Sequence, residues 1–406
     1  MAKNKFLNVK MTPAHPKWDN CIKRYDDLYG RTDDIRSEFN RDYNRILHSQ
    51  LYRRLRHKTQ VFFATKNDHI CTRMEHVNHV ASVSYTIADY LGLNAELTNA
   101  IAIGHDLGHP PFGHEGENIL NKLSLEHAGR KFWHEGNGIF VCDKIGTLPS
   151  PEGFQRNLHL TYGVRDGIVS HCGEIDENNI KPRDEYIDLY EIAEASQRQP
   201  YTWEACVVKI SDKISYLGRD IEDAIELRLL GKKQLLKLRT LIHDFSNIHT
   251  LNNTVLMHDL ITNLCSNSSP EDGLVLSEEH MNLMNAVKEF NYENIYSHPR
   301  LLHYQKYSNL IITTLFEILK KLYNPKDLDL ILKRHMNIYP ELARAFRSWL
   351  IKFSNLDSKE RKRKKLENNI VYDINSEKDY SKSIIDFIAG MTDNYAIKMY
   401  HEIISF

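Results

Sequence analysis

Six side chains that can bind a metal ion or transfer a proton are concentrated in residues 105–117, HDLGHPPFGHEGE. They are His105, Asp106, His109, His114, Glu115 and Glu117. The glycines and prolines between them favour a bend, which packs a core poorly but can direct polar side chains toward one point. We therefore expect a metal-dependent hydrolytic site here, completed by side chains from elsewhere in the chain.

Further ligands are expected where a polar residue falls on the apolar stripe of a predicted helix. His76 and Asp212 both do so. Burying an unpaired carboxylate costs several kcal/mol, so Asp212 needs a positive partner. Two alternatives remain open for these residues taken singly. His76 can be an ordinary core histidine, and Asp212 can pair with Lys209 or Lys213.

Taken together, these residues form a mixed nitrogen and oxygen ligand set: His76, His105, Asp106 and Asp212. Such a set suits Mn²⁺, Fe²⁺, Co²⁺ or Zn²⁺ and, less comfortably, Mg²⁺. Four protein ligands in a six-coordinate site leave positions for a water molecule and a phosphate oxygen. The metal can then polarise a phosphoryl group, lower the pKa of the water, or do both.

Local signals predict the helices that position these ligands. The apolar pattern predicts a helix over 74–91, ended by Gly92. Asn94 is a suitable N-cap for the next helix, which delivers His105 and Asp106 at its end.

A long helix is predicted over 203–230, with a stripe that advances in steps of about four residues. Asp212, Tyr216 and Asp220 share one face of it. The eight residues from Asp212 to Asp220 span two turns, or about 12 Å.

The remaining segments predict an all-α fold. The expectations are an irregular region over 1–30, helical structure over 33–63, short helices with a small hairpin over 129–180, amphipathic helices over 277–290 and 307–323, and loops over 267–273 and 356–369. We assign residues 31–232 to a catalytic core and residues 233–406 to a helical C-terminal region packed on it. The basic run RKRKK at 361–365 is interpreted as a solvated loop, with nucleic-acid or nucleotide binding as the alternative.

Composition limits the classes of function. With 41% hydrophobic residues among 406, the chain can bury a substantial core, and a net charge of -1 favours neither a nucleic-acid-coated surface nor an acidic partner. The six cysteines are scattered, which indicates reduced thiols and a cytoplasmic protein. We find no signal peptide and no apolar run long enough to cross a membrane.

The H…HD…D order of His76, His105-Asp106 and Asp212 resembles the signature of HD-domain metal phosphohydrolases. The flanking segments narrow the resemblance to the deoxyguanosine triphosphate triphosphohydrolase (dGTPase) family. They are KTQVF at 58–62, TRMEH at 72–76, HDLGHPPFGHEGE at 105–117, SDKISYLGRDIEDA at 211–224 and DFIAGMTDNYA at 386–396. The resemblance implies an HD-type helical fold from about Arg31 to the C-terminus.

The resemblance also implies a role for individual residues. His76, His105, Asp106 and Asp212 match the ligands of a single divalent metal ion, of which Mn²⁺ and Mg²⁺ are the first candidates. His114 matches the catalytic histidine, Glu117 the acid that orients it, and His134 a further histidine at the phosphates. Arg73 and Lys213 match phosphate-binding cations, Gln60, Tyr216 and Asp220 match residues around the sugar, and His109 matches a position in or just behind the site.

The implied reaction is hydrolysis of a deoxynucleoside triphosphate (dNTP), with dGTP as the first candidate and other dNTPs as alternatives, to a deoxynucleoside and tripolyphosphate. Two alternatives are a phosphohydrolase acting on a nucleoside monophosphate and a nucleotide or nucleic-acid sensor with weak catalysis. The family also implies a homo-oligomer, a tetramer or a hexamer, and an effector nucleotide or single-stranded DNA as a further partner. Segments 177–200 and 230–275 carry no motif of this family, so neither base preference nor allosteric activation is predicted.

Overall fold

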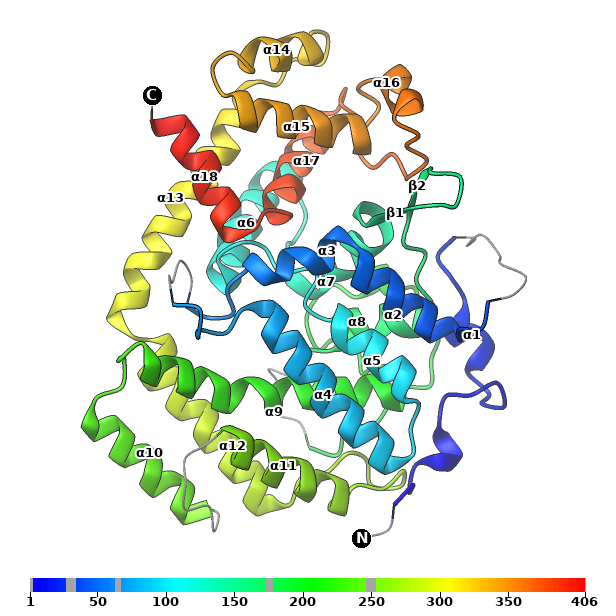
Figure 1. Cartoon of the computed structure of the whole chain (residues 1–406), viewed down its shortest axis with the longest axis vertical. Coiled ribbons are helices and arrows are strands. Elements are labelled where there is room, and N and C mark those ends of the chain that lie inside the picture. Colours follow the sequence, from blue (N-terminus) through cyan, green and yellow to red (C-terminus); the bar gives the residue numbers. More distant parts are fainter. Residues whose placement is uncertain (1–2, 27–33, 63–66, 173–177, 246–252, 406) are drawn as a thin grey trace.

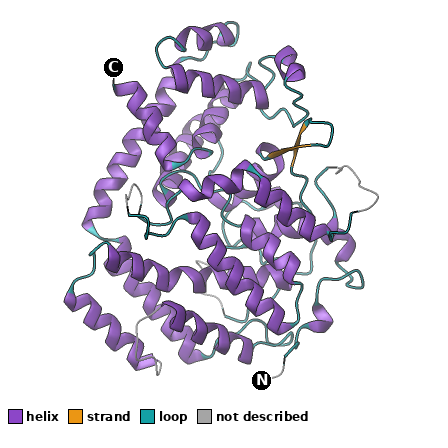
Figure 2. Cartoon of the chain, in the orientation of Figure 1, coloured by secondary structure: helices purple, strands orange, loops and turns teal. Residues whose placement is uncertain are grey.

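The computed structural model describes residues 3–26, 34–62, 67–172, 178–245 and 253–405, and the regular secondary structure of this part is almost entirely helical (Figures 1 and 2). The all-α prediction is confirmed. The helices are α1 (Trp18–Ile22), α2 (Glu38–His48), α3 (Gln50–Arg54), α4 (Arg73–Leu91), α5 (Ala95–Gly104), α6 (Gly113–Ala128), α7 (His134–Phe140), α8 (Tyr162–Ser170), α9 (Trp203–Glu226), α10 (Lys232–Phe245), α11 (Asn253–Asn267), α12 (Glu278–Asn291), α13 (Pro299–Lys321), α14 (Leu328–His335), α15 (Pro340–Phe353), α16 (Ser358–Arg363), α17 (Glu377–Ala389) and α18 (Asp393–Ile404).

Short turns of helix and one hairpin complete the described structure. The turns are η1 (Leu7–Val9), η2 (Leu55–His57), η3 (Val141–Ile145), η4 (Leu189–Glu191) and η5 (Tyr292–Tyr296). The antiparallel strands β1 (Thr147–Pro149) and β2 (Gln155–Asn157) form the small hairpin that the sequence predicts.

Helices α4, α5, α8 and α9 pack together and form the centre of the fold (Figure 1). Thr72 and Glu75 begin α4 with reciprocal capping hydrogen bonds, and Gly92 ends it with φ of 85°. The side chain of Asn94 then accepts hydrogen bonds from the first turn of α5, as predicted. These caps fix where α4 ends and where α5 begins, and His105 follows the last residue of α5.

The C-terminal helices complete the fold rather than forming a separate body. Helices α13 and α17 pack on α6, and α18 packs on α13. One buried apolar cluster runs from Met11 to Tyr400, and a second joins α4 and α9 to α10, α11 and α12. Both clusters therefore contain residues from each side of position 232, which stays a predicted boundary. Residues 27–30 of the N-terminal segment lie outside the described residues.

Two predicted elements differ from the structure. The helical pattern over 33–63 is divided at Ser49, which ends α2 and whose side chain caps α3; residues 33 and 63 lie outside the described part. The predicted helix over 203–230 ends at Glu226, and Arg228 adopts a left-handed conformation. The first difference arises at Ser49 because a serine side chain that accepts a hydrogen bond from a backbone N–H favours the start of a new helix over continuation of the previous one.

The basic run 361–365 also differs from the predicted loop. Its first three residues end helix α16. Arg361 is buried and donates hydrogen bonds to the carbonyl oxygens of Ile351 and Asn368. The other four cationic side chains of the run are exposed, so Arg361 holds the chain in place while its neighbours face solvent.

All six cysteines are buried and free, and no described helix is long and apolar enough to cross a membrane.

Candidate active site

His105 lies at the C-terminal end of α5 and points a nitrogen into the centre of the fold. Its Nδ1 donates to the carbonyl oxygen of Ala102 at 2.6 Å, so Nε2 carries the lone pair. That Nε2 is buried and has no hydrogen-bond partner within the described chain. His76 and Asp212 lie beside it, with ligand atoms of all three residues within 4.8 Å of one another. These donors fit one divalent cation, because an unpaired imidazole nitrogen and a carboxylate converge.

Asp106, the next residue, is fully paired. Its carboxylate contacts Arg73 Nη1 at 2.8 Å and His109 Nε2 at 2.9 Å. Burial opposes ionisation, but the Arg73 guanidinium and His109 hold the pKa of Asp106 well below its usual range. Asp106 is therefore an anion, as a metal ligand must be.

The partner that the structure identifies for Asp212 is His76, rather than Lys209 or Lys213. Its Oδ1 lies 2.9 Å from His76 Nε2, and both side chains face the same point from α9 and α4. Burial opposes ionisation here too, yet His76 and His105 lower the pKa of Asp212 to about 2. The contact joins two predicted ligands rather than an aspartate and a surface cation.

Arg73 connects the donor cluster to the bend that follows it. Its Nε and Nη2 atoms are buried and have no partner within the described residues. A Cβ atom built on Gly113 would lie 3.6 Å from Nη2, so this nitrogen faces the bend. A buried cation with two unused donors next to a metal-binding cluster can accept phosphate oxygens.

The bend carries His114 to the opening of the site. Phe112 and Gly113 adopt left-handed conformations with φ of 66° and 60°, after which α6 begins. The N–H of Phe112 donates to Asp393 Oδ1 at 3.0 Å, which holds the bend from α18. The His114 side chain is 62% exposed and can reach a bound molecule.

Glu117 lies between two histidines. One of its carboxylate oxygens is 3.0 Å from His134 Nδ1 and 3.6 Å from His114 Nδ1. The His134 ring stacks on His109 with centroids 3.8 Å apart. Burial opposes protonation of His134, but Glu135 and Glu117 raise its pKa to about 9. Glu117 therefore lies closer to His134 than to His114, the histidine with which the sequence analysis pairs it. Its carboxylate favours the positively charged form of His134.

Glu135 is buried, and one of its oxygens lies 3.4 Å from His134 Nδ1.

The sugar-side residues predicted on α9 lie further along the same helix. Asp220 is buried and accepts a hydrogen bond from the Tyr296 hydroxyl at 2.5 Å. Burial raises the pKa of Asp220 to about 7, although the Tyr296 hydrogen bond acts in the opposite direction. Lys213 is buried, and Tyr216 packs against the second apolar cluster. The buried Oε1 of Gln60 has no partner within the described chain.

Comparison with known proteins decides the family. Residues 73–217 match the HD domain and residues 356–402 match a phosphohydrolase-associated domain. A deoxyguanosinetriphosphate triphosphohydrolase-like protein of Caldanaerobacter subterraneus is 32% identical over 370 residues, covering 91% of this chain and 86% of that protein. Proteins of the same name from Rickettsia felis and Clostridium tetani are 31% and 30% identical, each over 91% of this chain and over 92% and 86% of their own lengths. The chain belongs to this family.

As a member of the deoxyguanosinetriphosphate triphosphohydrolase-like family, the chain is an HD-domain hydrolase. The region that matches the HD domain contains the converging donors, the bend and His134. The second matched region contains Asp393, which holds the bend in place. Both matched regions therefore contribute to the same site.

Two residues of this hydrolase's site are not found by sequence reasoning. His171 follows α8 as His105 follows α5, and its Nδ1 lies 2.7 Å from the carbonyl oxygen of Ile168. It forms one potential metal-binding group with His105 and Asp106 and another with His134 and Glu135. The available signal was a histidine directly after a buried apolar helix. Tyr296 carries no local signal, because only the packing of η5 on α9 brings it to Asp220.

Asp220 makes stability depend on pH. Its pKa in the folded enzyme is about 7, above the ordinary 3.8, so the folded state retains a proton that the unfolded chain has lost. The stabilising contribution is complete below about pH 4 and is lost as the pH rises through 7. We expect Asp220→Asn to gain stability relative to the unsubstituted enzyme between pH 5 and 7, by at most about 1.4 kcal/mol per pH unit. Urea unfolding of both proteins across this range measures the difference; parallel curves would contradict it.

Proposed function

We propose that the chain hydrolyses deoxynucleoside triphosphates, with dGTP as the first candidate, to a deoxynucleoside and tripolyphosphate. The proposal rests mainly on the position of Arg73. Its charge contacts Asp106 in the donor cluster, and its two unused nitrogens face the bend that bears His114. A phosphate bound there would lie between a metal site and an accessible histidine. The names of the related proteins support a triphosphate substrate.

His76, His105, Asp106 and Asp212 would hold one divalent ion, Mn²⁺ or Mg²⁺ in the first instance, with His171 close enough to take part. When bound, that ion supplies Lewis acidity that polarises a phosphoryl oxygen and makes a water molecule more acidic. Fe²⁺, Co²⁺ and Zn²⁺ also suit the mixed donors.

The protein's own groups would bind the triphosphate and move the proton. Arg73 and Lys213 neutralise phosphate oxygens, and the charged His134 adds a donor. A water molecule attacks the α-phosphorus and loses a proton to solvent, the bond to the 5′-oxygen breaks, and His114 gives its proton to that oxygen. His109 lies against both Asp106 and His134 and positions them.

The choice of deoxyribose over ribose would depend on side chains of α9, together with Gln60. Asp220 and Gln60 would hydrogen-bond the 3′-hydroxyl, since Gln60 Oε1 has no partner within the described residues, and burial raises the pKa of Asp220 to about 7, so that it carries a proton in part of the molecules near neutral pH. Tyr216 would occupy the space of a 2′-hydroxyl and so exclude ribonucleotides. A site that leaves a buried polar group unpaired, or clashes with a hydroxyl, discriminates strongly.

The test is incubation of the purified chain with each dNTP and each ribonucleoside triphosphate, in Mn²⁺ or Mg²⁺, followed by separation of the products. Intact tripolyphosphate together with a deoxynucleoside is the expected result. A parallel incubation uses nucleoside monophosphates, and release of orthophosphate from these alone would favour the other HD phosphohydrolase reaction. Binding of nucleotide with no metal-dependent turnover of any dNTP would favour a sensor.

The assembly and the effectors belong to the same proposal. A tetramer or hexamer is expected, together with a further nucleotide or single-stranded DNA as effector. Light scattering of the purified chain measures the oligomeric state directly.

A further inference from the structure

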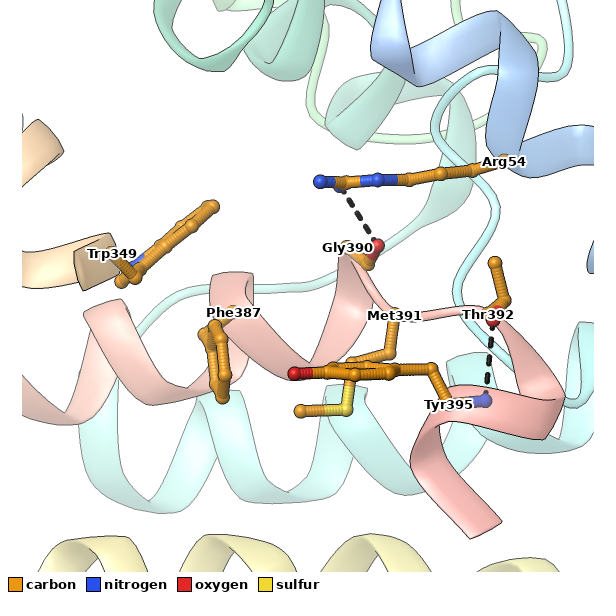
Figure 3. Close-up of a pocket in the computed structure, with 7 residues that line it drawn as sticks. All are labelled: Arg54, Trp349, Phe387, Gly390, Met391, Thr392 and Tyr395. Carbon is orange, nitrogen blue, oxygen red and sulfur yellow. Dashed lines mark hydrogen bonds between the residues drawn. The ribbon is translucent and has the colours of Figure 1, made fainter. Parts of the chain in front are cut away.

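Two cations hold the C-terminal junction, by which we mean residues 389–393 between α17 and α18. Arg54, at the end of α3, donates to the carbonyl oxygen of Gly390 at 2.8 Å (Figure 3). Lys58, four residues later, donates to the carbonyl oxygen of Ala389 at 3.2 Å. The junction lies in the region that matches the phosphohydrolase-associated domain, so both cations tie that region to the N-terminal part of the chain.

Lys58 differs from Arg54 because it also contacts the catalytic segment. Its Nζ donates to the carbonyl oxygen of His109 as well as to that of Ala389. The side chain is buried, and both of these acceptors are backbone carbonyl oxygens rather than carboxylates. Burial, together with the nearby guanidinium groups of Arg54 and Arg73, lowers the pKa of Lys58 to about 7. A buried ammonium group with such acceptors is costly, so its presence needs a reason.

His109 is the residue through which Lys58 reaches the site. The Nε2 atom of His109 lies 2.9 Å from Asp106 Oδ1. Its ring stacks on His134 with centroids 3.8 Å apart and meets His114 edge to face at 5.6 Å. The carbonyl group that Lys58 holds belongs to this same residue. A shift of the backbone there would therefore move one ring against all three of its neighbours in the site.

A second tie holds the bend three residues further along. Asp393 of the C-terminal junction accepts from the N–H of Phe112 at 3.0 Å and from the N–H of Thr59 at 3.1 Å. Phe112 has φ of 66°, a conformation that a residue other than glycine keeps only where its surroundings hold it. The bend between His109 and Phe112 is thus held at both ends by the same two segments of the chain.

We propose that Lys58 is a positioning residue, whose two hydrogen bonds couple the C-terminal junction to His109 and so set the orientation of the donors at the metal and at the phosphates. Its effect on turnover rests on the proposed function, whereas its effect on Asp106 does not. A purely structural role predicts the same consequences for loss of Lys58 and loss of Arg54, because each frees a carbonyl oxygen of the junction. A positioning role predicts that only loss of Lys58 changes the site.

Lys58→Met and Arg54→Met compare the two cations. Each variant removes a charge and a hydrogen bond to the junction but keeps an unbranched side chain that can fill the same space. We expect Lys58→Met to weaken Mn²⁺ binding about tenfold, as loss of an outer partner of a metal ligand does, and Arg54→Met to leave it unchanged. Titration of the full chain, stripped of metal, with Mn²⁺ measures this affinity without turnover, from the electron paramagnetic resonance signal of the free ion.

Turnover of dGTP at saturating Mn²⁺ is the second readout. Lys58→Met should lower kcat about tenfold to a hundredfold with little change in KM, because the reacting groups are displaced rather than removed. Arg54→Met should keep the kcat of the unsubstituted chain. In a His109→Ala background, Lys58→Met should lower kcat little further, since the residue through which Lys58 acts is already absent.

Three results would overturn the proposal. One is Mn²⁺ binding by Lys58→Met that is as tight as in the unsubstituted chain. Another is an equal loss of affinity in Arg54→Met, because the loss would then follow from the junction alone. The third is a full additional loss of kcat when Lys58→Met is combined with His109→Ala.

Circular dichroism and urea unfolding show whether each variant is folded. If Lys58→Met does not fold, Lys58→Gln takes its place with the same expected differences, because glutamine keeps a donor but is too short to reach both carbonyl oxygens. If no dNTP is hydrolysed at all, the proposed function fails, and the Mn²⁺ titration still decides the role of Lys58.

Discussion

Alanine at His114 is expected to lower dGTP turnover by about 10² to 10⁴-fold while nucleotide binding is retained. The side chain is mostly exposed at the start of α6, and its contacts are with Glu117 and, edge to face, with the rings of His109 and His134, so its loss should not disturb the fold. What disappears is the proton donor for the leaving 5′-oxygen. Single-turnover kinetics and equilibrium binding of dGTP measure the two effects separately.

His401→Ala provides the matched control, because His401 is an exposed histidine on α18. It should retain full turnover. Undiminished activity of His114→Ala would show that another group protonates the leaving oxygen, with the charged His134 as the next candidate.

Alanine at Asp106 and alanine at Asp212 are both expected to abolish metal binding and turnover, but only the first should destabilise the fold. Asp106 neutralises the buried Arg73 guanidinium at 2.8 Å, and breaking such a pair costs about 3 to 5 kcal/mol. Asp212 contacts His76, which can become neutral when its partner is removed. Metal content of the purified variants and their urea unfolding curves measure the two properties.

Two outcomes of this comparison would contradict the prediction. Equal loss of stability in the two would mean that the metal cluster, rather than the Arg73 pair, holds this part of the fold. A bound metal in either variant would remove that aspartate from the ligand set.

The sequence predicted the parts of the site that depend on local structure. His105 follows from an apolar helix with recognisable caps, and Asp212 follows from the four-residue stripe of α9. Both patterns are set by helix geometry, so residue types and spacing are enough to find them. The same reasoning located Gly92 and Asn94 as the caps between α4 and α5.

The missing parts depend on contacts between distant segments. Tyr296 reaches Asp220 across 76 residues, and His171 meets His105 only because α8 packs on α5. No spacing rule predicts such contacts. Arg361 shows a different limit, since a run of like charges predicts solvent exposure but one of its side chains is needed to satisfy backbone carbonyl oxygens.

Hydrolysis of dGTP in ¹⁸O-labelled water tests the central claim most directly. If water attacks the α-phosphorus and the 5′-oxygen leaves, one ¹⁸O atom enters tripolyphosphate and none enters deoxyguanosine. Mass spectrometry of the separated products is expected to show this pattern and to show no product without divalent metal. Label in deoxyguanosine, or release of pyrophosphate or orthophosphate in place of tripolyphosphate, would contradict the account.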